Sequence, residues 1–260
     1  MLLIPQKMYL SLYSSVKLTL MGTFFNSCLP GATGGDAIKI YYAIEGNHGR
    51  RTEIATLILF DRIVGMFALL ILPVLVSPLF FKLLGSVRIL RSLLWTSAAI
   101  ASMMVAVMLV CFASRLKNSR FLSRVFQKLP LGNHTKRMFD TLSNYRHNEN
   151  ILLTVVGMSL LVHVMNIAVI LFLAVILNPL GPSWEMSLLI PLGFLATTLP
   201  VTPGGIGVGE AAFNKLFTLV GLQGGAELLL GWRLLMILIG LIGLFFYLKG
   251  QKRFVHERGL

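Results

Sequence analysis

Charged residues, and acidic residues above all, are scarce in this chain of 260 residues. Only 13% of the residues are charged, and ten Asp and Glu stand against 23 Lys and Arg, which gives a formal net charge of +13. Hydrophobic residues make up 56% of the chain, and the mean hydropathy is +0.80. This composition excludes an ordinary soluble domain. It predicts an all-α membrane protein, a polytopic helical bundle.

Cysteines, histidines and catalytic motifs are equally sparse. The two cysteines, Cys28 and Cys111, lie in apolar segments and form neither a disulfide framework nor a CxxC pair. The loop histidines lack metal-ligand spacing, and no Ser-His-Asp or nucleophile-elbow arrangement occurs. We therefore predict no metal, no cofactor and no catalytic residue. The basic residues gather between apolar segments, as the positive-inside rule produces, so no nucleic-acid partner is expected.

Four apolar segments are long enough to cross a bilayer: residues 63–81, 93–112, 151–177 and 228–248. Residues 9–29 carry Lys17 at their middle and residues 186–199 are short, so each segment is expected to be a broken or re-entrant helix. The basic segment 115–150 and the basic residues 249–253 are assigned to the cytoplasm, which places the C-terminus there.

One helix-breaking phrase occurs twice. Leu-Pro-Gly-Ala-Thr-Gly-Gly at residues 29–35 returns as Leu-Pro-Val-Thr-Pro-Gly-Gly at residues 199–205, and a carboxylate follows each copy, Asp36 or Glu210. Hydrocarbon tolerates such exposed backbone only beneath protein or beside water, and interrupted helices at matching places indicate a transport site. We predict two re-entrant motifs in an inverted repeat, the first entering from the cytoplasm and the second from outside. Three full crossings after residue 178 are the alternative, which the short segment disfavours.

The glycine phrases allow two interpretations. Backbone N–H groups and the start of the next helix can bind an anion such as a lipid phosphate. Alternatively the phrases are helix breaks for close packing, with Asp36 as an N-cap. Two copies with one spacing favour the anion site. Arg62 and Arg233 each suit a phosphate, although Arg62 equally suits an interfacial anchor. His163 and Asn166, one turn apart, favour an interhelical hydrogen bond over a polar path.

These motifs resemble those of a known family. Residues 24–36 (Phe-Phe-Asn-Ser-Cys-Leu-Pro-Gly-Ala-Thr-Gly-Gly-Asp) resemble the FFN–LPG–GGD signature of the lysylphosphatidylglycerol synthase transmembrane region, the flippase-like domain family. Residues 61–65 (Asp-Arg-Ile-Val-Gly) are similar to its acid-Arg-x-x-Gly motif. Residues 199–210 resemble its P-x-x-PGG-x-G-x-x-E signature, and Arg233 falls where the family has a late arginine.

The resemblance implies a multi-pass inner-membrane protein of a bacterium or archaeon. In the best-understood members this domain is coupled to a soluble synthase that esterifies phosphatidylglycerol with an amino acid, and the membrane part translocates the lipid. We take residues 1–260 as a single flippase-like domain without the synthase. Helices that precede the first signature in the family are expected to be missing from a truncated start.

We accordingly expect a lipid flippase-like protein, not an enzyme, that translocates an anionic or aminoacylated phospholipid or a lipid-linked headgroup. One alternative is a membrane subunit of a lipid aminoacyl- or glycosyltransferase system, with a separate synthase or glycosyltransferase as its partner. Another is a scaffold for envelope-biosynthesis enzymes. The predicted residues of the headgroup site are Asn26, Gly34, Gly35, Asp36, Arg62, Gly204, Gly205, Glu210 and Arg233.

Overall fold

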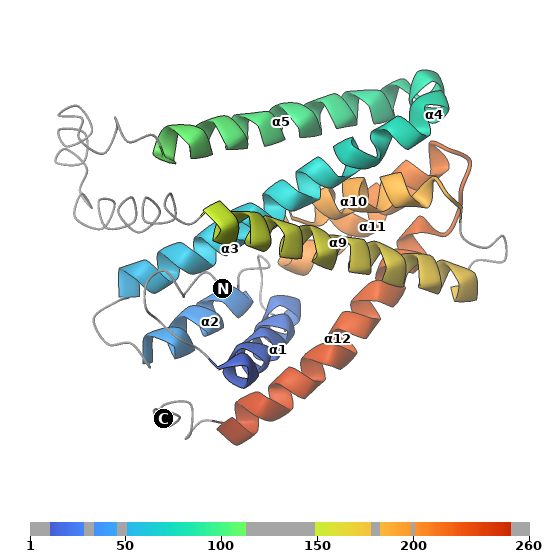
Figure 1. Cartoon of the computed structure of the whole chain (residues 1–260). Coiled ribbons are helices and arrows are strands. Elements are labelled where there is room, and N and C mark those ends of the chain that lie inside the picture. Colours follow the sequence, from blue (N-terminus) through green and yellow to red (C-terminus); the bar gives the residue numbers. More distant parts are fainter. Residues whose placement is uncertain are drawn as a thin grey trace.

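The computed structural model describes residues 11–28, 34–45, 51–112, 149–177, 183–198 and 201–250. Every regular element in these ranges is a helix (Figure 1), which confirms the predicted all-α class. Four helices are long and apolar enough to cross a membrane: Arg51–Ser86, Arg88–Leu109, Asn150–Leu177 and Gly225–Lys249. The chain is therefore a polytopic membrane protein. The cytoplasmic assignment of segment 115–150 lies almost entirely outside the described residues.

Three of the four predicted spans are confirmed to within a few residues. They are α5 (Arg88–Phe112), α9 (Glu149–Leu177) and α12 (Gly225–Gly250). The shorter elements are α1 (Leu12–Cys28), α2 (Gly34–Glu45), η2 (Ser77–Phe80), α4 (Phe81–Ser86), α10 (Met186–Thr197), η4 (Pro203–Gly205) and α11 (Val208–Thr218).

The predicted span at residues 63–81 is wrong at its start. The helix α3 (Arg51–Val76) begins twelve positions earlier, so Asp61 and Arg62 lie inside a helix and not at its opening. Its polar first half is helical because buried apolar residues recur every three or four positions. These residues are Ile54, Leu57, Phe60 and Val64, which pack with Ala43 of α2 and Val155 of α9. These tertiary contacts stabilise the helix, although charged residues lower the hydropathy of this half.

α1 runs unbroken from Leu12 to Cys28, although it contains a charge. The ammonium of Lys17 lies 3.9 Å from the centroid of the Tyr13 ring and 5.7 Å from that of Phe246 on α12. Cation–π contact stabilises a lysine where little water is available. The helix predicted to end at Pro30 is described as far as Cys28, and Pro30 itself lies outside the described residues.

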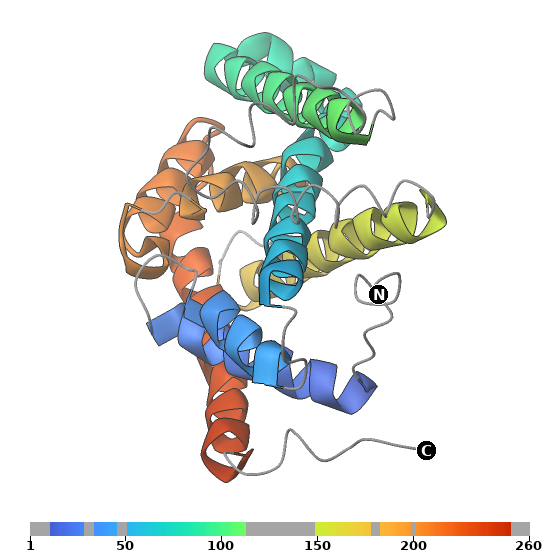
Figure 2. The same ribbon diagram turned by 90° about the vertical axis from the view of Figure 1, so that its left-hand side faces the viewer.

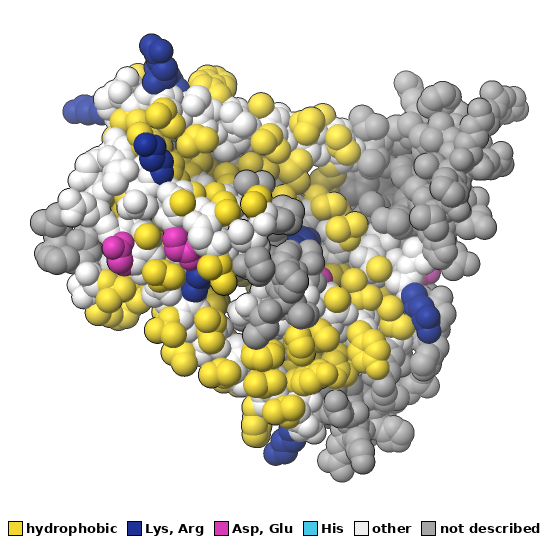
Figure 3. Space-filling view, turned by 180° about the vertical axis from the view of Figure 1, so that it is seen from behind, with side chains coloured by type: hydrophobic (Ala, Val, Ile, Leu, Met, Phe, Trp, Pro, Cys, Tyr) yellow, Lys and Arg dark blue, Asp and Glu magenta, His cyan; other side chains and the backbone are white. Residues whose placement is uncertain are grey.

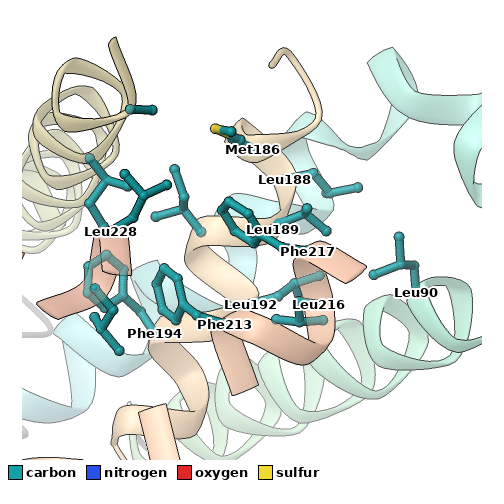
Figure 4. Close-up of a cluster of buried hydrophobic side chains, with 14 of the residues drawn as sticks. Leu90, Met186, Leu188, Leu189, Leu192, Phe194, Phe213, Leu216, Phe217 and Leu228 are labelled. Atoms are coloured by element: carbon teal, nitrogen blue, oxygen red, sulfur yellow. The ribbon is translucent and has the colours of Figure 1, made fainter. Parts of the chain in front are cut away.

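The short helix α10 forms the centre of the larger hydrophobic core. Its residues from Leu188 to Phe194 are all buried. Around it pack apolar side chains from α3, α5, α9, α11 and α12. In Figure 4, Phe194 and Phe213 face each other across α10 and α11, with ring centroids 5.5 Å apart. A segment too short to span a bilayer is thus enclosed by longer helices.

Six of the described helices form two sets of three with the same plan. In each set a helical hairpin, α1–α2 or α10–α11, precedes a long helix that carries an arginine, α3 or α12. The first helix of each hairpin packs against the long helix of the other set: α1 lies along α12, and α10 lies against α3. The helices α3 and α12 run in opposite directions in both Figure 1 and Figure 2. Opposite courses of α3 and α12 are what the predicted inverted repeat requires.

Equivalent contacts inside the two hairpins fix the register of this repeat. A Cβ atom added at Gly22 of α1 would lie 2.7 Å from Cε of Lys39 on α2. One added at Gly193 of α10 would lie 2.5 Å from the Phe213 ring on α11. We call each of these a glycine notch. The offset is 193 − 22 = 171 positions between the first helices and 213 − 39 = 174 between the second.

A second pair of contacts follows the same offsets. A Cβ atom at Gly35 would lie 2.8 Å from Cγ of Asn26, and one at Gly209 would lie 2.7 Å from Cγ2 of Thr197. The offsets are again 197 − 26 = 171 and 209 − 35 = 174. The repeat therefore extends beyond the glycine phrases to the residues on which the hairpins close.

The notch at Gly193 permits a direct test of hairpin packing. We expect Gly193→Ala to lower the free energy of unfolding by about 1–3 kcal/mol, because the new methyl overlaps the Phe213 ring. Gly157→Ala on α9 is the matched control, since no atom lies within 4 Å of an added Cβ. That control should stabilise the helix by about 0.5–1 kcal/mol. Thermal unfolding of the detergent-solubilised protein measures both, and equal shifts would contradict the packing.

Candidate functional site

An ion pair joins the first hairpin to α3. Nε of Arg62 lies 2.6 Å from Oδ2 of Asp36, which is in the first turn of α2. Nζ of Lys39, one turn further along α2, lies 3.8 Å from the other carboxylate oxygen of Asp36. The Gly35 N–H donates to Oδ1 of Asn26 at 2.9 Å, which ties the start of α2 to α1. Gly34, the first residue of α2, is buried beside them.

The second hairpin has an equivalent ion pair. Nε of Arg233 on α12 lies 2.6 Å from Oε1 of Glu210, which is in the first turn of α11. The other oxygen, Oε2, accepts a hydrogen bond from the Gly207 N–H at 2.6 Å. A carboxylate in this position stabilises the positive end of a helix. The two side chains are 14% and 16% exposed, so this pair is more buried than the first, whose side chains are 19% and 34% exposed.

The second glycine phrase turns its carbonyl groups toward Arg233. Nη1 donates to the Gly204 carbonyl at 2.7 Å and Nη2 donates to the Gly205 carbonyl at 2.9 Å. Both glycines have left-handed backbone angles, with φ of 59° and 69°. An L side chain there is strained, which explains the glycines. Arg233 therefore occupies two backbone carbonyls of this phrase, and Glu210 occupies the Gly207 N–H, a donor of the kind expected to receive an external anion.

The two halves meet where the second glycine phrase packs against the end of α1; residues 29–33 of the first phrase lie outside the described residues. η4 packs against α1, and a Cβ atom added at Gly204 would lie 3.9 Å from the Asn26 carbonyl and 3.8 Å from Nη1 of Arg233. Asn26 is in turn bonded to Gly35, the neighbour of Asp36. The structure thus brings the nine predicted residues into one connected region. Their role in headgroup binding stays a prediction.

Two hydrogen bonds from α9 hold both arginine-bearing helices. Nε2 of His163 lies 3.0 Å from the Gly65 carbonyl of α3, three residues beyond Arg62. Nε1 of Trp232, next to Arg233 on α12, donates to Oδ1 of Asn166 at 3.2 Å. The expected interhelical hydrogen bonds of His163 and Asn166 are therefore confirmed. The two residues act on the site through the helices they hold.

We expect Asn166→Leu to destabilise the protein more than His163→Leu. Removing Asn166 leaves the indole N–H of Trp232 unpaired, which costs about 1–3 kcal/mol. The Gly65 carbonyl also belongs to the helix ladder, so losing His163 should cost nearer the roughly 0.6 kcal/mol average for such bonds. The exposed Met165 provides the control Met165→Leu. Thermal unfolding that ranks His163→Leu as the more damaging variant would refute this assignment.

Five residues around the two ion pairs are not among the nine predicted for the headgroup site. Lys39 and Asp61 stand beside the first ion pair, while Thr197, Gly207 and Gly209 support the second. The offset of the glycine phrases, 199 − 29 = 170 positions, leads to Ala196 and Gly205 instead, so Thr197 and Gly209, at offsets of 171 and 174, were identified only from the structure. Among the described residues, no group of three or more His, Cys, Asp and Glu could hold a metal ion.

The fold and the paired sites define a class, the polytopic α-helical membrane proteins built on an internal repeat with a charged site at the repeat interface. The family model of the lysylphosphatidylglycerol synthase TM region matches residues 1–248. The chain belongs to this family. No curated protein and no solved structure matches it. The family and the four apolar helices fit a multi-pass membrane protein with a lipid-related function.

Proposed function

We propose that this protein moves a phospholipid with an anionic or aminoacylated headgroup between the leaflets of a cell inner membrane, with its C-terminus in the cytoplasm. One observation carries the proposal: each half of the repeat places a carboxylate–arginine pair at its hairpin, and the two pairs are linked through Asn26 and Gly204. Charges are costly within a membrane and mark substrate pathways there. A pair of such sites at a repeat interface suits alternating access to the two leaflets.

The ion pairs supply the chemistry that a headgroup needs in transit. A guanidinium binds phosphate through two parallel hydrogen bonds, as it binds a carboxylate. A lipid phosphate that replaces the carboxylate on an arginine therefore leaves no bare charge on that arginine. The released carboxylate then becomes a partner for a headgroup amine. Because each exchange conserves pairing, the headgroup avoids the penalty of an isolated ion in a low-dielectric medium.

Lipid exchange in liposomes tests the proposal. The purified chain is reconstituted with fluorescent phosphatidylglycerol and with an aminoacylated analogue, and dithionite quenching reports lipid that reaches the outer leaflet. We expect quenching of the inner-leaflet lipid well above the rate of protein-free liposomes, and its loss in Arg62→Ala and Arg233→Ala. Ser92→Ala on the exposed face of α5 is the control variant. Folded protein without exchange would reject translocation and favour a subunit of a transferase system.

We further propose that the second hairpin is re-entrant. The 12 residues of α10 reach about 18 Å, whereas the hydrocarbon core is about 30 Å thick. Val201, at the hairpin tip and 69% exposed, is therefore expected within the membrane. A cysteine there should react slowly with an impermeant thiol reagent from either side. Cysteines at Ser183 and Lys249 should react rapidly, from the outside and from the cytoplasm respectively. Rapid cytoplasmic labelling of position 201 would instead show three full crossings.

A further inference from the structure

The first half of the repeat carries two charges that the second half replaces with aromatic rings. The offset of 174 that relates the two glycine notches places Lys39 opposite Phe213. The arginines are offset by 233 − 62 = 171 positions, and the same offset places Asp61 opposite Trp232. The carboxylate–arginine pair is thus common to both halves, and a lysine and an aspartate are additional in the first.

The second half shows that the hairpin needs neither extra charge in order to close. Its notch at Gly193 receives the Phe213 ring, where the notch at Gly22 receives the stem of Lys39. Phe213 and Trp232 both pack on Phe194, with ring centroids 5.5 Å and 5.0 Å away, within the apolar core. Ionisable groups in membrane segments are expensive. Closure of the hairpin therefore does not explain why Lys39 and Asp61 are charged.

The two additional charged residues, Lys39 and Asp61, are accessible at the protein surface. The side chain of Lys39 is 29% exposed, and Asp61, the neighbour of Arg62 in α3, is exposed. Figure 3 shows how few charged side chains interrupt the apolar surface on one face of the molecule. The second site is less accessible, because the side chains of Glu210 and Arg233 are 14% and 16% exposed, against 19% and 34% for Asp36 and Arg62. On this difference we call the first site open and the second closed.

We propose that the two equivalent sites have different tasks. The first, formed by Asp36, Lys39, Asp61 and Arg62, recognises the lipid headgroup. Lys39 and Arg62 receive its phosphate, and Asp61 receives an amine attached beyond the phosphate. The second site, Glu210 with Arg233, is a latch that holds its hairpin closed. Lys39 and Asp61 thereby determine specificity for headgroups that carry both a phosphate and an amine. This inference rests on the proposed translocation.

Two neutral variants test this division of tasks in the full-length chain. Lys39→Met keeps an unbranched stem over Gly22, and Asp61→Asn keeps the size of the side chain. The probes are fluorescent phosphatidylethanolamine and lysylphosphatidylglycerol, which carry an amine, and phosphatidylglycerol, which does not. Binding to the detergent-solubilised protein and exchange in liposomes are measured separately. Lys215→Met, an exposed lysine of α11 outside the cluster, is the matched control.

We expect Asp61→Asn to weaken binding and exchange of the two amine-bearing lipids by at least about tenfold, with phosphatidylglycerol unaffected. Lys39→Met should weaken all three by a similar factor. If Lys39→Met does not fold, Lys39→Phe substitutes the residue that the second notch accepts. A wild-type chain that moves lipid, with an unchanged headgroup ranking in Asp61→Asn and unchanged binding and exchange of all three lipids in Lys39→Met, would overturn this inference alone. A wild-type chain that neither binds nor moves any of the three lipids would overturn the proposed translocation as well.

Discussion

Glu210→Ala is expected to lower the free energy of unfolding by roughly 3 kcal/mol, near the lower end of the range for a broken buried ion pair. The reason is that Arg233, 16% exposed, would keep its charge in a low-dielectric position without the carboxylate 2.6 Å away. The Gly207 N–H at the start of α11 would also lose its acceptor. Thermal unfolding of the purified variant, together with its yield as a monodisperse species, measures the loss.

A double variant separates this electrostatic effect from lost packing. Glu210→Ala combined with Arg233→Leu removes both charges, so it should recover part of the stability that the single variant loses. It cannot recover all of it, because the Gly204 and Gly205 carbonyls then lack their donors. A midpoint of Glu210→Ala equal to that of the wild type would show that the second pair does not hold its hairpin.

Asp36→Ala is expected to reduce lipid exchange strongly and the free energy of unfolding only slightly. Its pair with Arg62 is more exposed, with side chains 19% and 34% accessible, so solvent screening limits the stability loss to about 1 kcal/mol or less. Lipid exchange should fall roughly 100-fold, which corresponds to the roughly 3 kcal/mol that a hydrogen bond to a charged group can contribute. The dithionite assay on liposomes with matched protein content measures this rate.

The charge-exchanged variant Asp36→Arg with Arg62→Asp is the matched control. It restores an ion pair between α2 and α3 while moving the guanidinium to another helix. We expect a folded protein without exchange, because binding of a headgroup depends on where the charges stand as well as on their pairing. Its thermal midpoint should lie below that of the wild type, because the new arginine would stand beside Lys39. Full exchange by Asp36→Ala would remove the first site from the mechanism.

Membrane class, helical content and three of the four spans followed from the sequence by itself, because each depends on local composition. An apolar run of some 20 residues must be helical in hydrocarbon, whatever its neighbours are. The glycine phrases were equally visible, because Pro and paired Gly interrupt a helix locally. The start of α3 was missed because its polar half is helical through contacts with α2 and α9, and hydropathy contains no record of such contacts.

Tertiary structure alone decided how the charged residues are used. The sequence contains Asp36, Arg62, Glu210 and Arg233, but their pairing depends on how each hairpin packs against the long helix that follows it. The same holds for the direction of the Gly204 carbonyl, which a left-handed backbone angle turns toward Arg233. A distance between side chains on two helices is set by crossing angle and rotation. These follow from the packing of the whole core, because side chains interlock only in particular arrangements.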